Sequence, residues 1–176
     1  MYRLDELIKL NRKLYHSNDL AILWGLANKN TLYTAIKRYV AKGVLIPVYK
    51  GLYATIPLAQ LDPLELGVAV IHKFAYLSTE SVLAQAGTIS QTTYGLTFVS
   101  SVSRSLTVGN VTFRYRKLKD EYLNNPAGLT HQNGIFVAIP ERAAADMLYF
   151  NPRYHFDVPD SLDWDRLNAI RKEVGY

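Results

Sequence analysis

The residues with the clearest chemical potential lie between Asn30 and Gly43. The apolar residues of this stretch recur at the spacing of one helix face: Leu32, Ala35, Ile36, Tyr39 and Val40. The opposite face holds hydroxyls, one phenol and three cations but no acid: Thr31, Tyr33, Thr34, Lys37, Arg38 and Lys42. Such side chains can donate to phosphates and to the edges of DNA bases. An ordinary solvated helix face can have the same composition, so the flanking elements have to decide between the two interpretations.

The elements around this helix match a known arrangement. We predict that Asn30 caps the helix and that Gly43 ends it. A first helix is expected over 3–11, an extended segment over 13–16, and a short apolar helix over 19–24 after the capping residues Ser17 and Asn18. A short helix, a tight turn with Gly25 and a longer basic helix are typical of a helix-turn-helix.

A β-hairpin is predicted directly after this helix pair. Residues 44–49 and 52–56 are rich in strand-forming side chains, and Lys50-Gly51 supplies the turn between them. Pro47 cannot donate to a sheet ladder, so it belongs on an edge strand. A helix-turn-helix closed by a hairpin is a winged helix-turn-helix, and Lys50 lies at the tip of the wing, where a phosphate can reach it.

The charge distribution supports a nucleic-acid partner. The chain has 20 Lys/Arg and 15 Asp/Glu among 176 residues. Residues 1–57 hold nine of these cations and three of the acids, whereas residues 58–176 hold eleven and twelve. The basic character therefore belongs to the N-terminal third, as expected for a DNA-binding module joined to a nearly neutral one.

The rest of the chain predicts a second domain over 62–176. Residues 57–61 form the joint, Asp62-Pro63 opens a helix to about 73, and Ser78 caps another that ends at 86. Strands are expected over 96–101, 105–108, 111–118 and 134–139. Helices follow over 140–149 and 162–174, and the last is capped by Asp160 or Ser161. The fold class is therefore α+β: an N-terminal winged helix-turn-helix (1–57) followed by a mixed α/β domain (62–176).

One predicted strand of the second domain has a basic outer face. In residues 111–118, Phe113 and Tyr115 alternate with Arg114 and Arg116, which is typical of a half-buried strand. This face suits either an acidic partner or plain solvation.

Patterns typical of enzymes are absent from the sequence. It has no cysteine, which excludes disulfides, thiol catalysis and cysteine-bound zinc, and its four histidines share no metal-ligand spacing. Glu141 and Asp146 are five residues apart and lie on different faces of a helix, so they make a poor acid–base pair. We expect no catalysis, no cofactor and no metal.

The same sequence gives no sign of a membrane or secreted protein. No apolar run approaches the ~20 residues of a membrane helix, and acids occupy the place of a signal-peptide core. We therefore expect no membrane partner and a cytoplasmic location.

Two segments of the second domain resemble a known family. They are Tyr-Leu-Ser-Thr-Glu-Ser-Val-Leu-Ala-Gln-Ala-Gly (76–87) and Ala-Ile-Pro-Glu-Arg-Ala-Ala-Ala-Asp-Met-Leu-Tyr (138–149). Both are similar to segments of the antitoxins of AbiE-type abortive-infection systems, the type IV toxin–antitoxin systems, where they follow a winged N-terminal domain. This chain departs from the pattern at Val82 and at the run 143–145, and it ends just after its last predicted helix, which predicts a reduced antitoxin surface.

The resemblance implies an autorepressor that opposes a nucleotidyltransferase-like toxin, either by direct contact or through the toxin's target. Its partner would be double-stranded promoter DNA, bound by a pair of protomers on an inverted repeat. The residues predicted to bind DNA are Lys29, Asn30, Thr31, Tyr33, Thr34, Lys37, Arg38, Lys42 and Lys50. The alternatives are a winged-helix module that binds a protein, or a transcriptional regulator without an antitoxin role.

Overall fold

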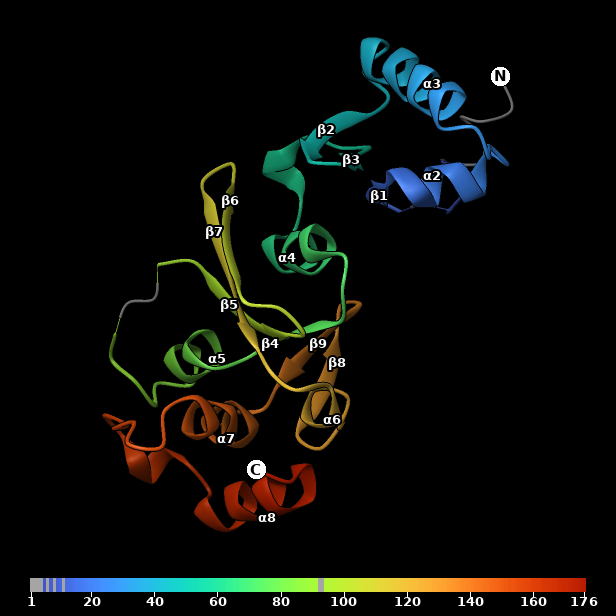
Figure 1. Cartoon of the computed structure of the whole chain (residues 1–176). Helices are drawn as coiled ribbons and strands as arrows, with labels where there is room; N and C mark the ends of the chain where they lie inside the picture. Colours follow the sequence, from blue (N-terminus) through green and yellow to red (C-terminus); the bar gives the residue numbers. More distant parts are fainter. Residues whose placement is uncertain (1–4, 6, 8, 11, 92–93) are drawn as a thin grey trace. The chain divides into compact units, whose positions relative to one another are not determined.

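The computed structural model describes the chain except for residues 1–4, 6, 8, 11 and 92–93 (Figure 1). It confirms the α+β class. The chain divides into two compact units, Met1–Val70 and Ile71–Tyr176. This division lies beyond the joint expected at 57–61, because the helix that starts at Pro63 packs with the first unit.

The first unit combines helices with three short strands. Its described elements are β1 (Leu14–His16), α2 (Ser17–Leu23), α3 (Lys29–Ala41), β2 (Ile46–Tyr49), β3 (Leu52–Ala54), the short 3-10 helix η1 (Leu58–Gln60) and α4 (Pro63–Ile71). The strands form an antiparallel sheet in the order β1-β3-β2, so Pro47 does lie on an edge strand. The helix expected over 3–11 lies largely outside the described residues.

The core of the first unit forms where α2 and α3 meet. Leu20 and Trp24 pack with the predicted apolar stripe of α3, which is buried at Leu32, Ala35 and Ile36. The Trp24 and Tyr39 rings stack at 5.2 Å. Packing on one stripe therefore fixes the orientation of α3 and leaves its polar side outward.

The start of α3 differs from the prediction. Asn28 caps the helix, and its side-chain oxygen accepts from the backbone N–H groups of Asn30 and Thr31 at 2.9 and 3.2 Å. Asn30 is the second residue of the helix. Gly43 ends α3 as predicted, with φ +70° and an N–H that donates to Val40 O at 3.0 Å.

Helix α4 is tied to the first unit by side-chain contacts. Asp62 caps it as predicted, accepting from the Leu64 N–H at 2.8 Å. The Nε2 of His16 donates to Ala69 O at 2.7 Å, and Lys13 Nζ lies 3.7 Å from Glu65 Oε2. These contacts explain why the division of the chain comes after this helix.

The second unit is built on a mixed six-stranded sheet in the order β6-β7-β5-β4-β9-β8. The strands are β4 (Ala75–Leu77), β5 (Leu96–Ser100), β6 (Arg104–Val108), β7 (Val111–Lys117), β8 (Leu129–Gln132) and β9 (Ile135–Ala138). Pairs β5–β7 and β4–β9 are parallel, and the other neighbours are antiparallel. The strands predicted for this unit are confirmed as β5, β6, β7 and β9, whereas β4 and β8 were not predicted.

Among the described residues, four α-helices accompany this sheet, α5 (Glu80–Gln85), α6 (Asp120–Leu123), α7 (Pro140–Phe150) and α8 (Trp164–Val174), together with the short 3-10 helix η2 (Pro159–Ser161). Helix α7 packs against both α5 and α8 (Figure 1). The short α6 was not predicted. The cap of α8 is Asp163, which accepts from the Arg166 N–H at 3.0 Å, so the expectation of Asp160 or Ser161 was wrong.

Ser78 was also assigned the wrong role. Helix α5 begins two residues later at Glu80, after Thr79 with φ +52°. The Ser78 hydroxyl is buried and donates to Asp146 on α7 at 2.7 Å. Among the described residues, no helix is long and apolar enough to cross a membrane.

Candidate nucleic-acid interface and buried polar network

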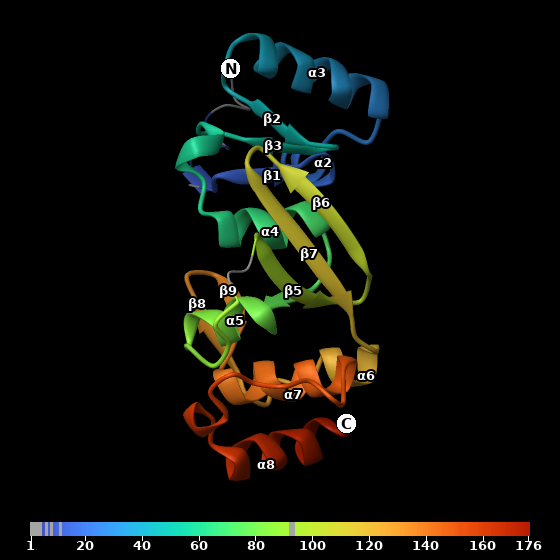
Figure 2. The same ribbon diagram turned by 90° about the vertical axis from the view of Figure 1, so that its left-hand side faces the viewer.

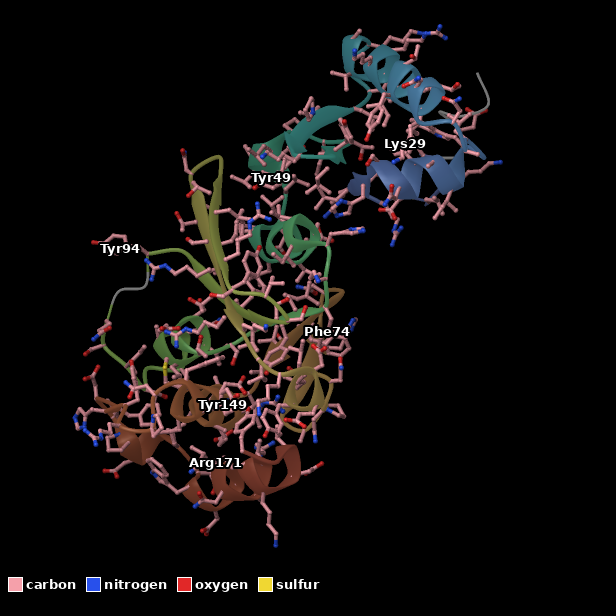
Figure 3. The ribbon with its side chains drawn as sticks, viewed as in Figure 1. Lys29, Tyr49, Phe74, Tyr94, Tyr149 and Arg171 are labelled. Atoms are coloured by element: carbon pink, nitrogen blue, oxygen red, sulfur yellow. The ribbon has the colours of Figure 1, made fainter. Side chains whose placement is uncertain are left out.

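All nine residues predicted to bind DNA are exposed in the first unit. Eight lie on α3 or directly after it, and Lys50 lies in the β2–β3 turn. Tyr33 retains 47% of its surface in the middle of the helix. Figure 3 labels Lys29, at the start of α3. The helix therefore presents its predicted polar side chains to solvent.

The cations of this surface are not neutralised by acids in the described part of the chain. No ion pair found there involves Lys29, Lys37, Arg38, Lys42 or Lys50. The first turn of α3 has no acid either. The face thus presents uncompensated positive charge together with hydroxyl and amide donors, which suits an anionic ligand.

Hydrogen bonding within the helix limits what Thr34 can do. Its hydroxyl donates to Asn30 O at 2.8 Å, so its proton is already used. Toward a DNA base, Thr34 can offer only oxygen lone pairs and a methyl group. Lys37 and Arg38, one turn further on, therefore supply most of the donor capacity in the middle of the helix.

Tyr33 is close to the sheet of the same unit. Burial raises the pKa of Tyr53 on β3, and the neighbouring Tyr33 phenol raises it further. The Gly51 backbone has φ +71°, and its carbonyl accepts from the Ser17 N–H at 2.8 Å, which anchors the turn that carries Lys50. Helix face and turn are thus held within one small unit.

The second unit contains a buried polar network that sequence reasoning missed. Arg142 and Asp146 lie one turn apart on α7, with Nε and Oδ1 separated by 2.9 Å and both side chains 0% exposed. Tyr76 of β4 links them: its hydroxyl donates to Asp146 Oδ2 at 3.0 Å and accepts from Arg142 Nη2 at 3.0 Å.

Further groups complete the network. Ser78 donates to Asp146 Oδ2, and the Tyr176 hydroxyl donates to Asp146 Oδ1. Arg142 Nη1 donates to Ala127 O at 2.8 Å, and its guanidinium carbon lies 5.4 Å from the Tyr76 ring and 5.7 Å from the Tyr176 ring. Every polar atom of the pair is therefore satisfied, as a buried ion pair requires.

Burial determines the titration of these groups. It raises the pKa of Tyr76 and Tyr176, and the negative charge of Asp146 raises both further. Burial also raises the pKa of Asp146, although the Arg142 charge and three hydroxyl donors act against it. For Arg142, burial lowers the pKa, but Asp146 and the phenols outweigh that effect and leave it raised.

The network joins the two segments that carry the antitoxin resemblance. Tyr76 and Ser78 come from segment 76–87, and Arg142 and Asp146 come from segment 138–149. In the first segment, Glu80 also pairs with Arg116 of β7, and Ser81 Oγ accepts from the Thr97 N–H at 2.7 Å. Because Arg142 and Asp146 have no exposed surface, their pairing joins the two segments in the interior of the unit.

Comparisons with known proteins concern the fold only. No family model matches the chain, and no curated protein sequence matches it. Among solved structures, it is similar to the RV2827C protein from Mycobacterium tuberculosis, with a TM-score of 0.55 and 14% identity. The similarity covers 96% of this chain and 69% of that one. At such low identity this similarity describes shared architecture.

Proposed function

We propose that the first unit is a winged helix-turn-helix that binds double-stranded promoter DNA. Helices α2 and α3, joined by a glycine-containing turn, supply the helix pair, and the β2–β3 hairpin of the β1-β3-β2 sheet supplies the wing. The observation that carries the proposal is the exposed face of α3, which has cations and hydroxyls but no acid. Recognition helices meet DNA through such a face.

Within this proposal the residues divide into two groups. Tyr33, Lys37 and Arg38 lie in the middle of α3 and would meet base edges or adjacent phosphates, together with Thr34. Lys29, Lys42 and Lys50 lie at the ends of the helix or on the wing turn, where phosphate contact is expected. A pair of protomers on an inverted repeat is the arrangement that we expect.

The first experiment is a salt titration of promoter binding by the full chain. If roughly five cations per protomer contact phosphates, the log–log slope of affinity against salt should be about −4 to −5 per protomer bound. Lys50→Ala should weaken operator and random DNA about equally, whereas Arg38→Ala should cost operator binding ~1–3 kcal/mol more than random binding. A slope near zero would reject the proposal.

We further propose that the protein is an antitoxin that represses its own operon in the cytoplasm and opposes a nucleotidyltransferase-like toxin. The support is the resemblance of segments 76–87 and 138–149, whose side chains organise the second unit. Toxicity should be measured with the toxin of the neighbouring reading frame expressed beside the full chain or beside Lys37→Ala/Arg38→Ala. We expect the double variant to lose repression and keep protection.

The alternatives give different results in the same assays. A regulator without an antitoxin role would show no protection in any variant, or protection that follows DNA binding throughout. A winged module that binds a protein would show no salt-dependent affinity for promoter DNA.

A further inference from the structure

The second unit has a strongly uneven charge distribution along the chain. Residues 81–119 contain five Lys/Arg and no acid, whereas residues 120–176 contain five Lys/Arg and nine acids. The acid-free stretch includes β5, β6 and β7. The two stretches have equal numbers of cations, so the net positive charge of 81–119 comes from its lack of acids; two of its cations, Arg116 and Lys119, pair with Glu80 and Glu121 outside the stretch.

Strands β6 and β7 form a two-stranded antiparallel ribbon at the edge of that sheet. The register places Ser105 opposite Arg114 and Thr107 opposite Thr112, so these four side chains share one face. Ser105, Thr107 and Arg114 are exposed, Thr112 is half-buried, and the two threonine hydroxyls lie 3.1 Å apart. This ribbon face carries three hydroxyls and one guanidinium.

The ribbon face begins where the helical cover of the sheet ends. Arg116 lies on the same side of β7 as Arg114, but it pairs with Glu80 of α5 and its guanidinium carbon lies 5.3 Å from the Phe150 ring of α7. No ion pair among the described residues engages Arg114, one pleat further along. Figure 2 shows β6 and β7 running side by side.

The chemistry of this face selects among anionic partners. Protein interfaces have an apolar and aromatic centre, and the ribbon face has no apolar side chain. Phosphates and base edges, by contrast, are bound by guanidinium and hydroxyl groups. A two-stranded ribbon also has the width that a DNA major groove admits.

We propose that the β6–β7 ribbon is a second surface of the protein that binds duplex DNA. Arg114 would donate to a phosphate or to a guanine edge, and Ser105, Thr107 and Thr112 would bind adjacent phosphates. The inference rests on the proposed function, because both surfaces are assigned to the same DNA.

The test uses the full chain and two promoter duplexes. The short duplex contains only the stretch of promoter whose binding is weakened by Lys37→Ala and therefore depends on α3. The long duplex extends that stretch by one helical turn on each side. Arg114→Ala is compared with Lys172→Ala, which removes an exposed cation from α8 and so changes net charge equally. Thermal unfolding verifies that both variants are folded.

We expect the wild-type protein to bind the long duplex more tightly than the short one. Arg114→Ala should remove that difference and reduce the salt slope on the long duplex by about 0.9 for each phosphate that the variant no longer binds. Lys172→Ala should leave both unchanged.

Two outcomes would overturn the inference, and they are distinguishable. If Lys37→Ala abolishes binding while Arg114→Ala matches wild type on both duplexes, the ribbon does not bind DNA although α3 does. If the wild-type protein shows no salt-dependent binding to either duplex, the proposed function fails and this inference fails with it.

Discussion

One hydrogen bond limits the contacts that the Thr34 side chain could make with a DNA base. Because its proton is donated to Asn30 O, only its lone pairs and its methyl group remain available. Thr34→Ser keeps the hydroxyl oxygen, and Thr34→Val keeps the methyl group.

We expect the two variants to separate the two kinds of contact open to Thr34. If the methyl group meets a thymine, Thr34→Val should retain operator specificity and Thr34→Ser should lose part of it; an accepted hydrogen bond predicts the reverse. The measurement is the ratio of operator to random-DNA affinity for each variant. If both variants keep the wild-type ratio, Thr34 does not read the operator.

Buried Tyr76 predicts a specific response to alkali. Its folded-state pKa is raised above its unfolded value, so the stability that it contributes is complete below pH ~10 and is lost as pH rises further. Above that pH, the free energy of unfolding should fall by about 1.4 kcal/mol per pH unit for this one phenol.

Denaturant unfolding between about pH 9 and 11.5, on either side of the ordinary phenol pKa, measures this slope. Tyr76→Phe should make it shallower by about that amount, whatever its effect on stability at neutral pH. Tyr94→Phe is the matched control, because Tyr94 is 82% exposed (Figure 3). Equal slopes for wild type and Tyr76→Phe would contradict the assignment.

At the scale of elements, two glycines should respond differently to the same substitution. Both have a left-handed backbone, with φ +70° at Gly43 and +71° at Gly128. A Cβ at Gly43 would meet nothing within 4 Å, whereas one at Gly128 would lie 2.7 Å from the Arg142 Cβ.

Gly43→Ala should therefore lower the free energy of unfolding by only about 1–2 kcal/mol, which is the cost of a left-handed backbone for a residue with a Cβ. Gly128→Ala should cost more, because Arg142 must move and the buried network around Asp146 is disturbed. Chemical denaturation of each variant measures both costs. Equal losses would mean that the chain near Gly128 relaxes without affecting Arg142.

The elements that sequence analysis predicted are those with local signals. The apolar stripe of α3, the Lys50-Gly51 turn and the Pro140 helix start each depend on residues a few positions apart. Adjacent alternatives were harder to separate: Asn28 and Asn30 are equally good caps, and only the structure shows that Asn28 is used.

The buried network could not be predicted in this way. Tyr76 and Ser78 are 70 and 68 positions from Asp146, and a serine before a helix is normally read as a cap. The i,i+4 spacing of Arg142 and Asp146 was the one available signal. It was missed because Asp146 was compared with Glu141 instead.

At the scale of the whole molecule, the division after Val70 changes how the chain should be cut. A fragment of residues 1–57 lacks α4, with its buried Leu66 and Val70 and the bond from His16 to Ala69. We expect fragment 1–70 to unfold at a higher temperature than 1–57 and to bind operator DNA better.

The complementary fragment, 71–176, should unfold cooperatively and bind operator DNA poorly, because α3 is absent. If the antitoxin proposal is correct, it should still protect cells from the neighbouring toxin. Thermal unfolding, gel shifts and co-expression provide the measurements. Identical unfolding of 1–57 and 1–70 would show that α4 does not stabilise the first unit.

The two units should also differ in how early they can form during synthesis. The sheet of the first unit uses only strands between Leu14 and Ala54, whereas β4 of the second unit must wait for β9, where Tyr76 pairs with Phe136. Contacts that are distant in sequence form slowly, and chains fold from the N-terminus as they leave the ribosome. A nascent chain would thus complete the unit that carries α3 while its second sheet is still incomplete. If the proposed functions are correct, promoter binding would begin before protection against a toxin is available.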